Sequence, residues 1–285
     1  MVVENIPSPF HIYFEIATLG ILLTVSTQTG VFFGERFLHK KAMMNLTGFL
    51  ASILGFLYSV FELGYWFKGI GTIFTCSHIS YVTAFLQGML NAMAFVHLFL
   101  RANTTNVFNP KWRYFRIISL ILIAANWSTV LGVIVDRTYD EYEGFDGVRC
   151  MIFPGTYILR VKYLVELLNH VAQAMFFVWP LWVHIKLLDS AVIGGLNSSS
   201  GSDLFRNMAK RAIAAMTFSV IVTAIVTSLV IYSQEEKLPT IALGILDSSA
   251  ILGSIYFANC SDMSYRNSDR TPVSFQGKNS SCTEV

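Results

Sequence analysis

The chain has 285 residues, of which 54% are hydrophobic and only 13% are charged, and its formal net charge is +2. Soluble domains carry roughly 25% charged residues, so this composition leaves too little polar surface for a water-soluble fold. The small net charge gives no basic surface for nucleic acid, and four cysteines without a CxxC spacing exclude a disulfide-rich scaffold and a CxxC-type zinc site. The composition therefore predicts an integral membrane protein.

Seven stretches are long and apolar enough to cross a bilayer. A spanning helix needs about 20 mostly apolar residues, and backbone groups in lipid find partners only when the segment is helical. In chain order the predicted spans are residues 12–34, 43–66, 77–100, 117–135, 161–187, 212–232 and 240–259. The expected fold is an all-α, polytopic seven-helix transmembrane domain over residues 1–259, followed by a disordered, serine-rich tail over 260–285.

Lysine and arginine are divided unequally between the two sets of connections. Of the 20 basic residues, 14 follow the first, third or fifth span or lie in the tail. Because cytoplasmic loops are enriched in these residues, the expected orientation places the amino terminus outside and the carboxyl terminus in the cytoplasm. The sequons at Asn103, Asn197 and Asn279 then fall on the cytoplasmic side and are predicted to be unglycosylated.

Four acidic residues fall within the predicted spans, all in the outer half: Glu15, Glu62, Glu166 and Asp247. Ionisable groups inside a membrane are costly and usually face the bundle interior or a wet cavity. His170 stands one helical turn after Glu166 on the same face. These positions suggest an externally open, electronegative cavity that binds a cation, which is an amine ligand, a metal ion or a proton. The depth of Glu166, His170 and Asp247 favours a functional role for these three.

The two acids nearest the membrane interface have a structural interpretation as well. Glu15 and Glu62 can lie at the membrane interface and pair with Lys68, Arg160 or Lys162. In that case they anchor helix ends and bind no ligand.

A face of small and hydroxyl-bearing residues recurs at intervals of four along the sixth span, at Ala215, Ser219, Thr223 and Thr227. Such faces let helices approach closely, so they predict packing and not chemistry. Asn91 and Gln87 in the third span and Asn126 in the fourth are expected to hydrogen-bond between helices.

Two cysteines and a group of basic residues give the layout a family likeness. Cys76 opens the third span and Cys150 lies in the long external loop after the fourth, so both face the oxidising side, where a disulfide can form. Arg101 follows Cys76 by 25 residues at the cytoplasmic end of the third span, and Lys210 and Arg211 lie at the foot of the sixth. In these features the chain resembles rhodopsin-like (class A) G-protein-coupled receptors.

The resemblance implies a plasma-membrane receptor that senses an external, cation-bearing ligand. By analogy, the ligand contacts Glu166, His170, Asp247 and Glu62, and binding opens the cytoplasmic face around Arg101 to a heterotrimeric G protein or another transducer. No cofactor is expected, and the expected partners are the lipid bilayer and the cytoplasmic transducer. The terminal residues 283–285, Thr-Glu-Val, suit capture by a PDZ domain.

A proton- or cation-coupled transporter or channel is the alternative function, because it would use the same intramembrane acids. The spans show no internal repeat of the kind that transporters contain. An enzyme is not expected, because the six histidines form no HxxxH or HExxH pair and no serine has an evident base beside it.

Overall fold

The computed structural model describes residues 9–66, 76–106, 112–144, 147–154, 156–193, 200–232 and 240–268. It contains seven helices, α1 (Pro9–His39), α2 (Met43–Trp66), α3 (Cys76–Thr105), α4 (Trp112–Val135), α5 (Thr156–Ile193), α6 (Ser200–Tyr232) and α7 (Thr240–Ser268). Two strands, β1 (Arg137–Gly144) and β2 (Gly147–Pro154), lie between α4 and α5. All seven helices are long and apolar enough to cross a membrane, which confirms the predicted seven-helix fold.

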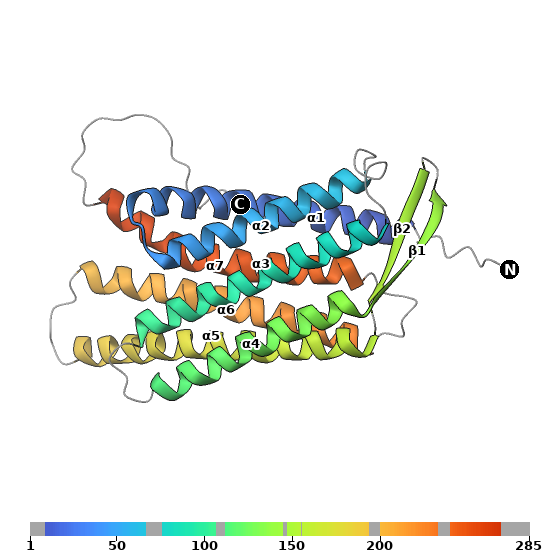
Figure 1. Cartoon of the computed structure of the whole chain (residues 1–285). Coiled ribbons are helices and arrows are strands. Elements are labelled where there is room, and N and C mark those ends of the chain that lie inside the picture. Colours follow the sequence, from blue (N-terminus) through green and yellow to red (C-terminus); the bar gives the residue numbers. More distant parts are fainter. Residues whose placement is uncertain are drawn as a thin grey trace, which may run out of the picture.

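The helices form one elongated bundle in which chain direction alternates from each helix to the next (Figure 1). The two strands lie beyond one end, which is called the hairpin end, and α1, α3, α5 and α7 run from there to the opposite end. α3 is central, because it packs against α2, α4, α5 and α7, while α7 also packs against α1 and α6. Side chains that α3, α5 and α7 direct inward therefore meet in the interior of the bundle.

Several helices extend well beyond the predicted spans. α5 has 38 residues, about 57 Å at 1.5 Å per residue, and α6 begins at Ser200 although its predicted span begins at residue 212. Hydropathy identifies only the part of a helix that crosses the roughly 30 Å hydrocarbon core, whereas backbone hydrogen bonding continues past it. Exposed aromatic residues stand on α5 at Tyr157, near the hairpin end, and at Trp179 and Trp182 further along.

The two strands were not predicted. β1 and β2 pair in antiparallel register from Arg137 with Pro154 to Gly144 with Gly147, and the hairpin lies against α3. The apolar alternation of Val148, Cys150 and Ile152, next to glycines at the turn, is the sequence signal for such a hairpin. The side chains of Cys76 and Cys150 lie outside the described residues, so their disulfide stays a prediction.

Close helix contacts depend on glycine at two positions of α3 and α7. A Cβ atom on Gly88 would overlap Cγ1 of Val130, so glycine permits the approach of α3 to α4. A Cβ atom on Gly244 would lie 2.6 Å from both the Tyr163 hydroxyl and Nε2 of Gln87. These approaches bring α3, α4, α5 and α7 close enough for short polar side chains to meet between them.

Candidate functional site

Polar side chains of α3, α5, α6 and α7 meet in the bundle interior, nearer the hairpin end of α5 and α7. Glu166, His170 and Asp247 are completely buried there. The whole group, which is called the polar cluster, comprises Asn91, Lys162, Glu166, Asn169, His170, Gln173, Ser219, Thr223, Asp247 and Ser248. Two chains of hydrogen bonds run through it.

The first chain joins α5, α6 and α7 through Thr223. Its hydroxyl donates to Oδ1 of Asp247 at 2.6 Å and lies 3.0 Å from Nδ1 of His170. Since the only hydroxyl hydrogen of Thr223 points at the carboxylate, Nδ1 of His170 must be the donor of the second bond. Nε2 of His170 lies 3.0 Å from Oγ of Ser219. Thr223 therefore connects the imidazole of His170 to the carboxylate of Asp247.

The second chain joins α3, α5 and α7 through Glu166. Nζ of Lys162, one helical turn earlier on α5, lies 2.5 Å from Oε2 of Glu166. Nδ2 of Asn91 donates to Oε1 of the same carboxylate, and Oγ of Ser248 donates to Oδ1 of Asn91 at 2.8 Å. Ser248 follows Asp247 directly, so the two chains converge on neighbouring residues of α7.

The polar cluster contains two carboxyl groups and one ammonium group. It holds the carboxyl groups of Glu166 and Asp247 against the ammonium of Lys162, which interacts electrostatically with both. Among the described residues, Oδ2 of Asp247 has no hydrogen-bond partner. A buried carboxylate oxygen without a donor is costly. The cluster thus has the chemistry to accept a proton or a cation.

The structure brings three of the predicted ligand-binding residues into one cluster and leaves the fourth apart. Glu166, His170 and Asp247 belong to the hydrogen-bond chains above. Glu62 is also buried, but it lies on α2, which contributes no side chain to these chains. The side chains of the first three are fully buried, so none of them is exposed to the externally open cavity that the sequence predicted.

Two parts of the cluster were not anticipated. Lys162, at the outer end of the predicted fifth span, was one of the expected partners for Glu15 or Glu62, but it pairs with Glu166 on the same helix. The spacing of four residues between Lys162 and Glu166 on one helix is the signal that identifies this pair. Thr223 was interpreted as packing only, because its partners on α5 and α7 depend on how those helices are rotated.

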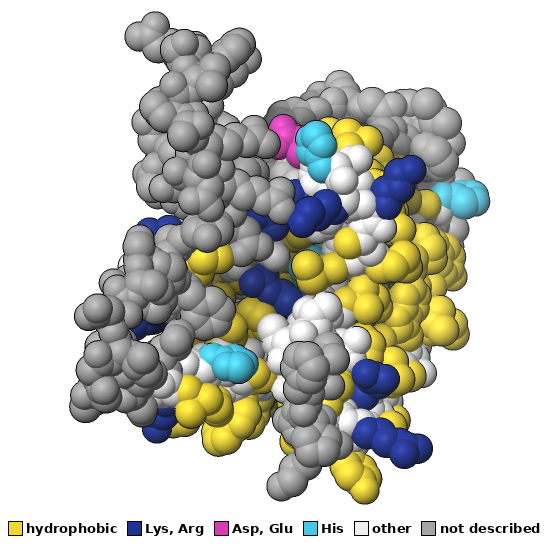
Figure 2. Space-filling model, turned by 90° about the vertical axis from the view of Figure 1, so that its left-hand side faces the viewer, with side chains coloured by type: hydrophobic (Ala, Val, Ile, Leu, Met, Phe, Trp, Pro, Cys, Tyr) yellow, Lys and Arg dark blue, Asp and Glu magenta, His cyan; other side chains and the backbone are white. Residues whose placement is uncertain are grey.

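At the opposite end, Arg101 joins the same central helices. Its Nη2 donates to the backbone carbonyl of Ala258 in α7 at 2.7 Å, and its guanidinium carbon lies 4.4 Å from the centre of the Phe177 ring in α5. Lys210 and Arg211 are exposed at this end of α6. Figure 2 shows that lysine and arginine side chains predominate among the charged groups of this face.

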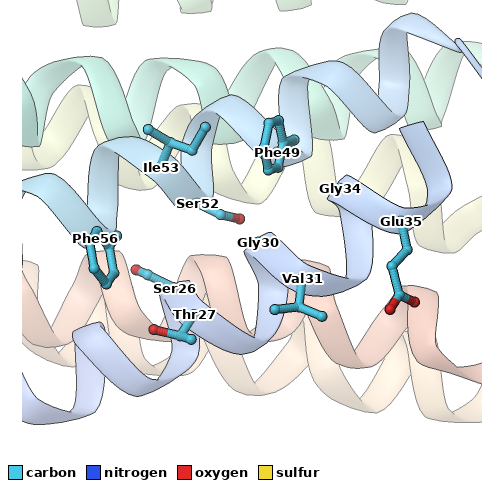
Figure 3. A pocket seen from close by; sticks show the side chains of 10 residues that line it. All are labelled: Ser26, Thr27, Gly30, Val31, Gly34, Glu35, Phe49, Ser52, Ile53 and Phe56. Atoms are coloured by element: carbon cyan, nitrogen blue, oxygen red, sulfur yellow. The ribbon is translucent and has the colours of Figure 1, made fainter. Parts of the chain in front are cut away.

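A groove of about 370 Å³ lies between α1 and α2 (Figure 3). Gly30 and Gly34 of α1 and Phe49 and Phe56 of α2 are among its lining residues. It opens on the outer surface of two membrane-spanning helices, and its walls are almost entirely apolar. No residue of the polar cluster lines this groove, so it does not provide the predicted cation site.

Comparison with known proteins assigns no family. Neither the models of known protein families nor the curated proteins contain a match to this chain. The class that the fold defines is a seven-helix integral membrane protein, and its distinguishing feature is a buried polar cluster that includes an ion pair.

Proposed function

We propose that the protein is a seven-helix membrane receptor, with the layout of a G-protein-coupled receptor, that senses a cation-bearing ligand from the hairpin end. The observation that carries this proposal is that α3, α5 and α7 are linked twice. The polar cluster joins them in the hairpin half, and Arg101 joins them at the opposite end. A rearrangement at one link changes the geometry of the same helices at the other.

The distribution of charge supports a cytoplasmic location for the opposite end. Arg101, Lys210 and Arg211 belong to a wider set of basic residues there, which includes Arg36, Lys40, Lys41, Arg113, Arg116, Lys186 and Arg206. An excess of lysine and arginine marks cytoplasmic loops. In this orientation the hairpin faces the outside of the plasma membrane, where the disulfide of Cys76 and Cys150 would hold it to α3. The opposite end then meets a G protein or another transducer, and residues 283–285 meet a PDZ domain.

The chemistry of signalling begins at Asp247. A ligand cation in the polar cluster adds positive charge near the Asp247 carboxyl group, whose Oδ2 has no hydrogen-bond partner among the described residues. Oδ1 of Asp247 accepts a hydrogen bond from Thr223, which is also hydrogen-bonded to His170. A movement of the carboxylate therefore displaces Thr223 on α6 and, through it, His170 on α5. The ligand therefore acts on three helices through one carboxyl group.

The test is a comparison of binding with conformational change in lipid nanodiscs. Thermal stability is measured with a panel of amines for the wild type, Asp247→Asn and Glu166→Gln, because a ligand of the folded state raises the melting temperature by mass action. Glu35→Gln is the matched control, since Glu35 is an exposed acid of α1 outside the cluster. A fluorophore on Lys210→Cys reports movement at the opposite end. The proposal fails when no amine shifts stability, or when the shift survives both cluster substitutions.

A proton- or cation-coupled transporter is the second candidate, and His97 favours it. This residue of α3 is completely buried between the cluster and Arg101, and its Nδ1 lies 2.9 Å from the carbonyl of Met44. Its Nε2 has no hydrogen-bond partner in the described part of the chain. Proteoliposomes loaded with a pH-sensitive dye decide between the two, since a transporter moves protons or cations down an imposed gradient and a receptor does not.

A further inference from the structure

We propose that the ammonium of Lys162 occupies the position that a ligand's ammonium takes on binding, so that the ligand is a small molecule with a primary ammonium group. The inference rests on the proposed function and specifies the ligand chemistry of the same site. In the ligand-free protein the Lys162 ammonium then occupies the binding position, and activation replaces it with the ammonium of the ligand.

The surroundings of Lys162 form a site for an ammonium ion. Nζ lies 2.5 Å from Oε2 of Glu166 and 4.1 Å from the centre of the Tyr163 ring. A carboxylate and an aromatic face are the two groups that bind ammonium ions best in proteins. The Lys162 side chain is only 9% exposed, so the site excludes most water.

The charge balance favours the exchange of one cation for another when Lys162 leaves. If its ammonium withdrew alone, the buried carboxyl groups of Glu166 and Asp247 would lose the cation that faces both. Leaving a buried charge without its partner is strongly unfavourable. A second cation that arrives as Lys162 leaves avoids that state.

The position of Lys162 suits a movement toward the hairpin end. It stands six residues after the first residue of α5, about 9 Å along the helix axis, and Glu166 lies one turn deeper. A long lysine side chain near a helix end can extend its charged group toward the membrane surface. A ligand from the hairpin end therefore reaches Glu166 along the path that the Lys162 head vacates. Since Oε1 is held by Asn91, the ligand needs an N–H to donate to Oε2.

The test removes Lys162 and restores an ammonium from solution. Lys162→Ala in nanodiscs is melted in propylammonium chloride and, at the same concentration, in potassium chloride, tetramethylammonium chloride or propanol. We expect a lower melting temperature than in the wild type, recovered by propylammonium alone. An amine at ten times its Kd should raise the folded-to-unfolded ratio about tenfold. Lys186→Ala is the matched control, because the Lys186 ammonium lies 3.7 Å over the ring of the exposed Trp182.

The inference is overturned if Lys162→Ala is as stable as the wild type, or if primary amines do not recover it. Should the variant not be obtained folded in potassium chloride, the yield of folded protein prepared with propylammonium is the readout. The double variant Lys162→Ala with Glu166→Gln has the same cavity and one carboxylate fewer, so it should need no amine. If primary amines restore the melting temperature of Lys162→Ala but no amine changes that of the wild type, the ammonium site at Lys162 is supported and the receptor proposal fails.

Discussion

Replacing Thr223 by valine tests whether the polar cluster holds the helices together. Valine keeps the shape of threonine and removes only the hydroxyl, which donates to Asp247 at 2.6 Å and lies 3.0 Å from Nδ1 of His170. One interhelical hydrogen bond in a membrane protein contributes about 0.6 kcal/mol, and at most about 1.7 kcal/mol. Thr223 makes two, and its loss leaves the buried Asp247 carboxyl without a hydrogen-bond donor among the described residues. We expect a decrease of about 2–3 kcal/mol in the free energy of unfolding.

The matched control is Thr227→Val, one turn further along the same face of α6. Thr227 is also buried, but its hydroxyl lies 3.4 Å from the backbone carbonyl of Tyr163, at the limit of a hydrogen bond. We expect its loss to change the free energy of unfolding by about 0.5 kcal/mol or less. Thr223→Ser keeps a hydroxyl and should retain most of the stability. The assay is equilibrium unfolding in mixed micelles by titration with SDS, and equal losses for the two valine variants would refute the reasoning.

Three further predictions concern helix packing, the opposite end and topology. Gly88→Val should lower stability by several kcal/mol, because its side chain would overlap Val130, whereas Gly20→Val, with nothing within 4 Å, should be nearly neutral in thermal melts. Arg101→Gln should reduce the free energy of unfolding by about 1–2 kcal/mol and increase movement of the label at Lys210→Cys, since it weakens the contact of α3 with α7 and α5. In intact cells, a membrane-impermeant thiol reagent should leave Lys210→Cys unlabelled until the membrane is permeabilised, and labelling from outside would reverse the proposed orientation.

The fold was predictable because the bilayer restricts the backbone structures that a spanning segment can adopt. A span such as 43–66 must be helical in lipid, and its prediction matches α2 to the residue. The predicted spans for α5 and α6 are shorter than the helices, because the polar extensions of these helices are held by backbone hydrogen bonds and are not detected by hydropathy. The hairpin was not predicted, because hydropathy identifies spanning helices and the short strands β1 and β2 lie between two of them.

The cluster was predictable in part. The cost of ionisable groups at depth singles out Glu166, His170 and Asp247 without any structure. What the residues do to one another was not predictable, because it depends on the rotation of each helix about its axis. Thr223 faces both His170 and Asp247 only in the observed rotation of α6. The ion pair of Lys162 with Glu166 lies within one helix and could have been found from its spacing alone.

The exposed aromatic residues of α5 locate the cluster in the electric field of the membrane. Aromatic residues gather at both membrane interfaces, and Tyr157 and Trp182 lie about 37 Å apart along the helix. Glu166 is about 14 Å from Tyr157, a little over a third of that distance. In the proposed receptor, a ligand cation that binds at Glu166 while Lys162 stays in place crosses this fraction of the membrane potential. The binding free energy of the ligand then changes by about 0.8 kcal/mol per 100 mV, which is about fourfold in affinity. If Lys162 moves outward as the ligand moves inward, the two displacements largely cancel, and binding is nearly independent of voltage.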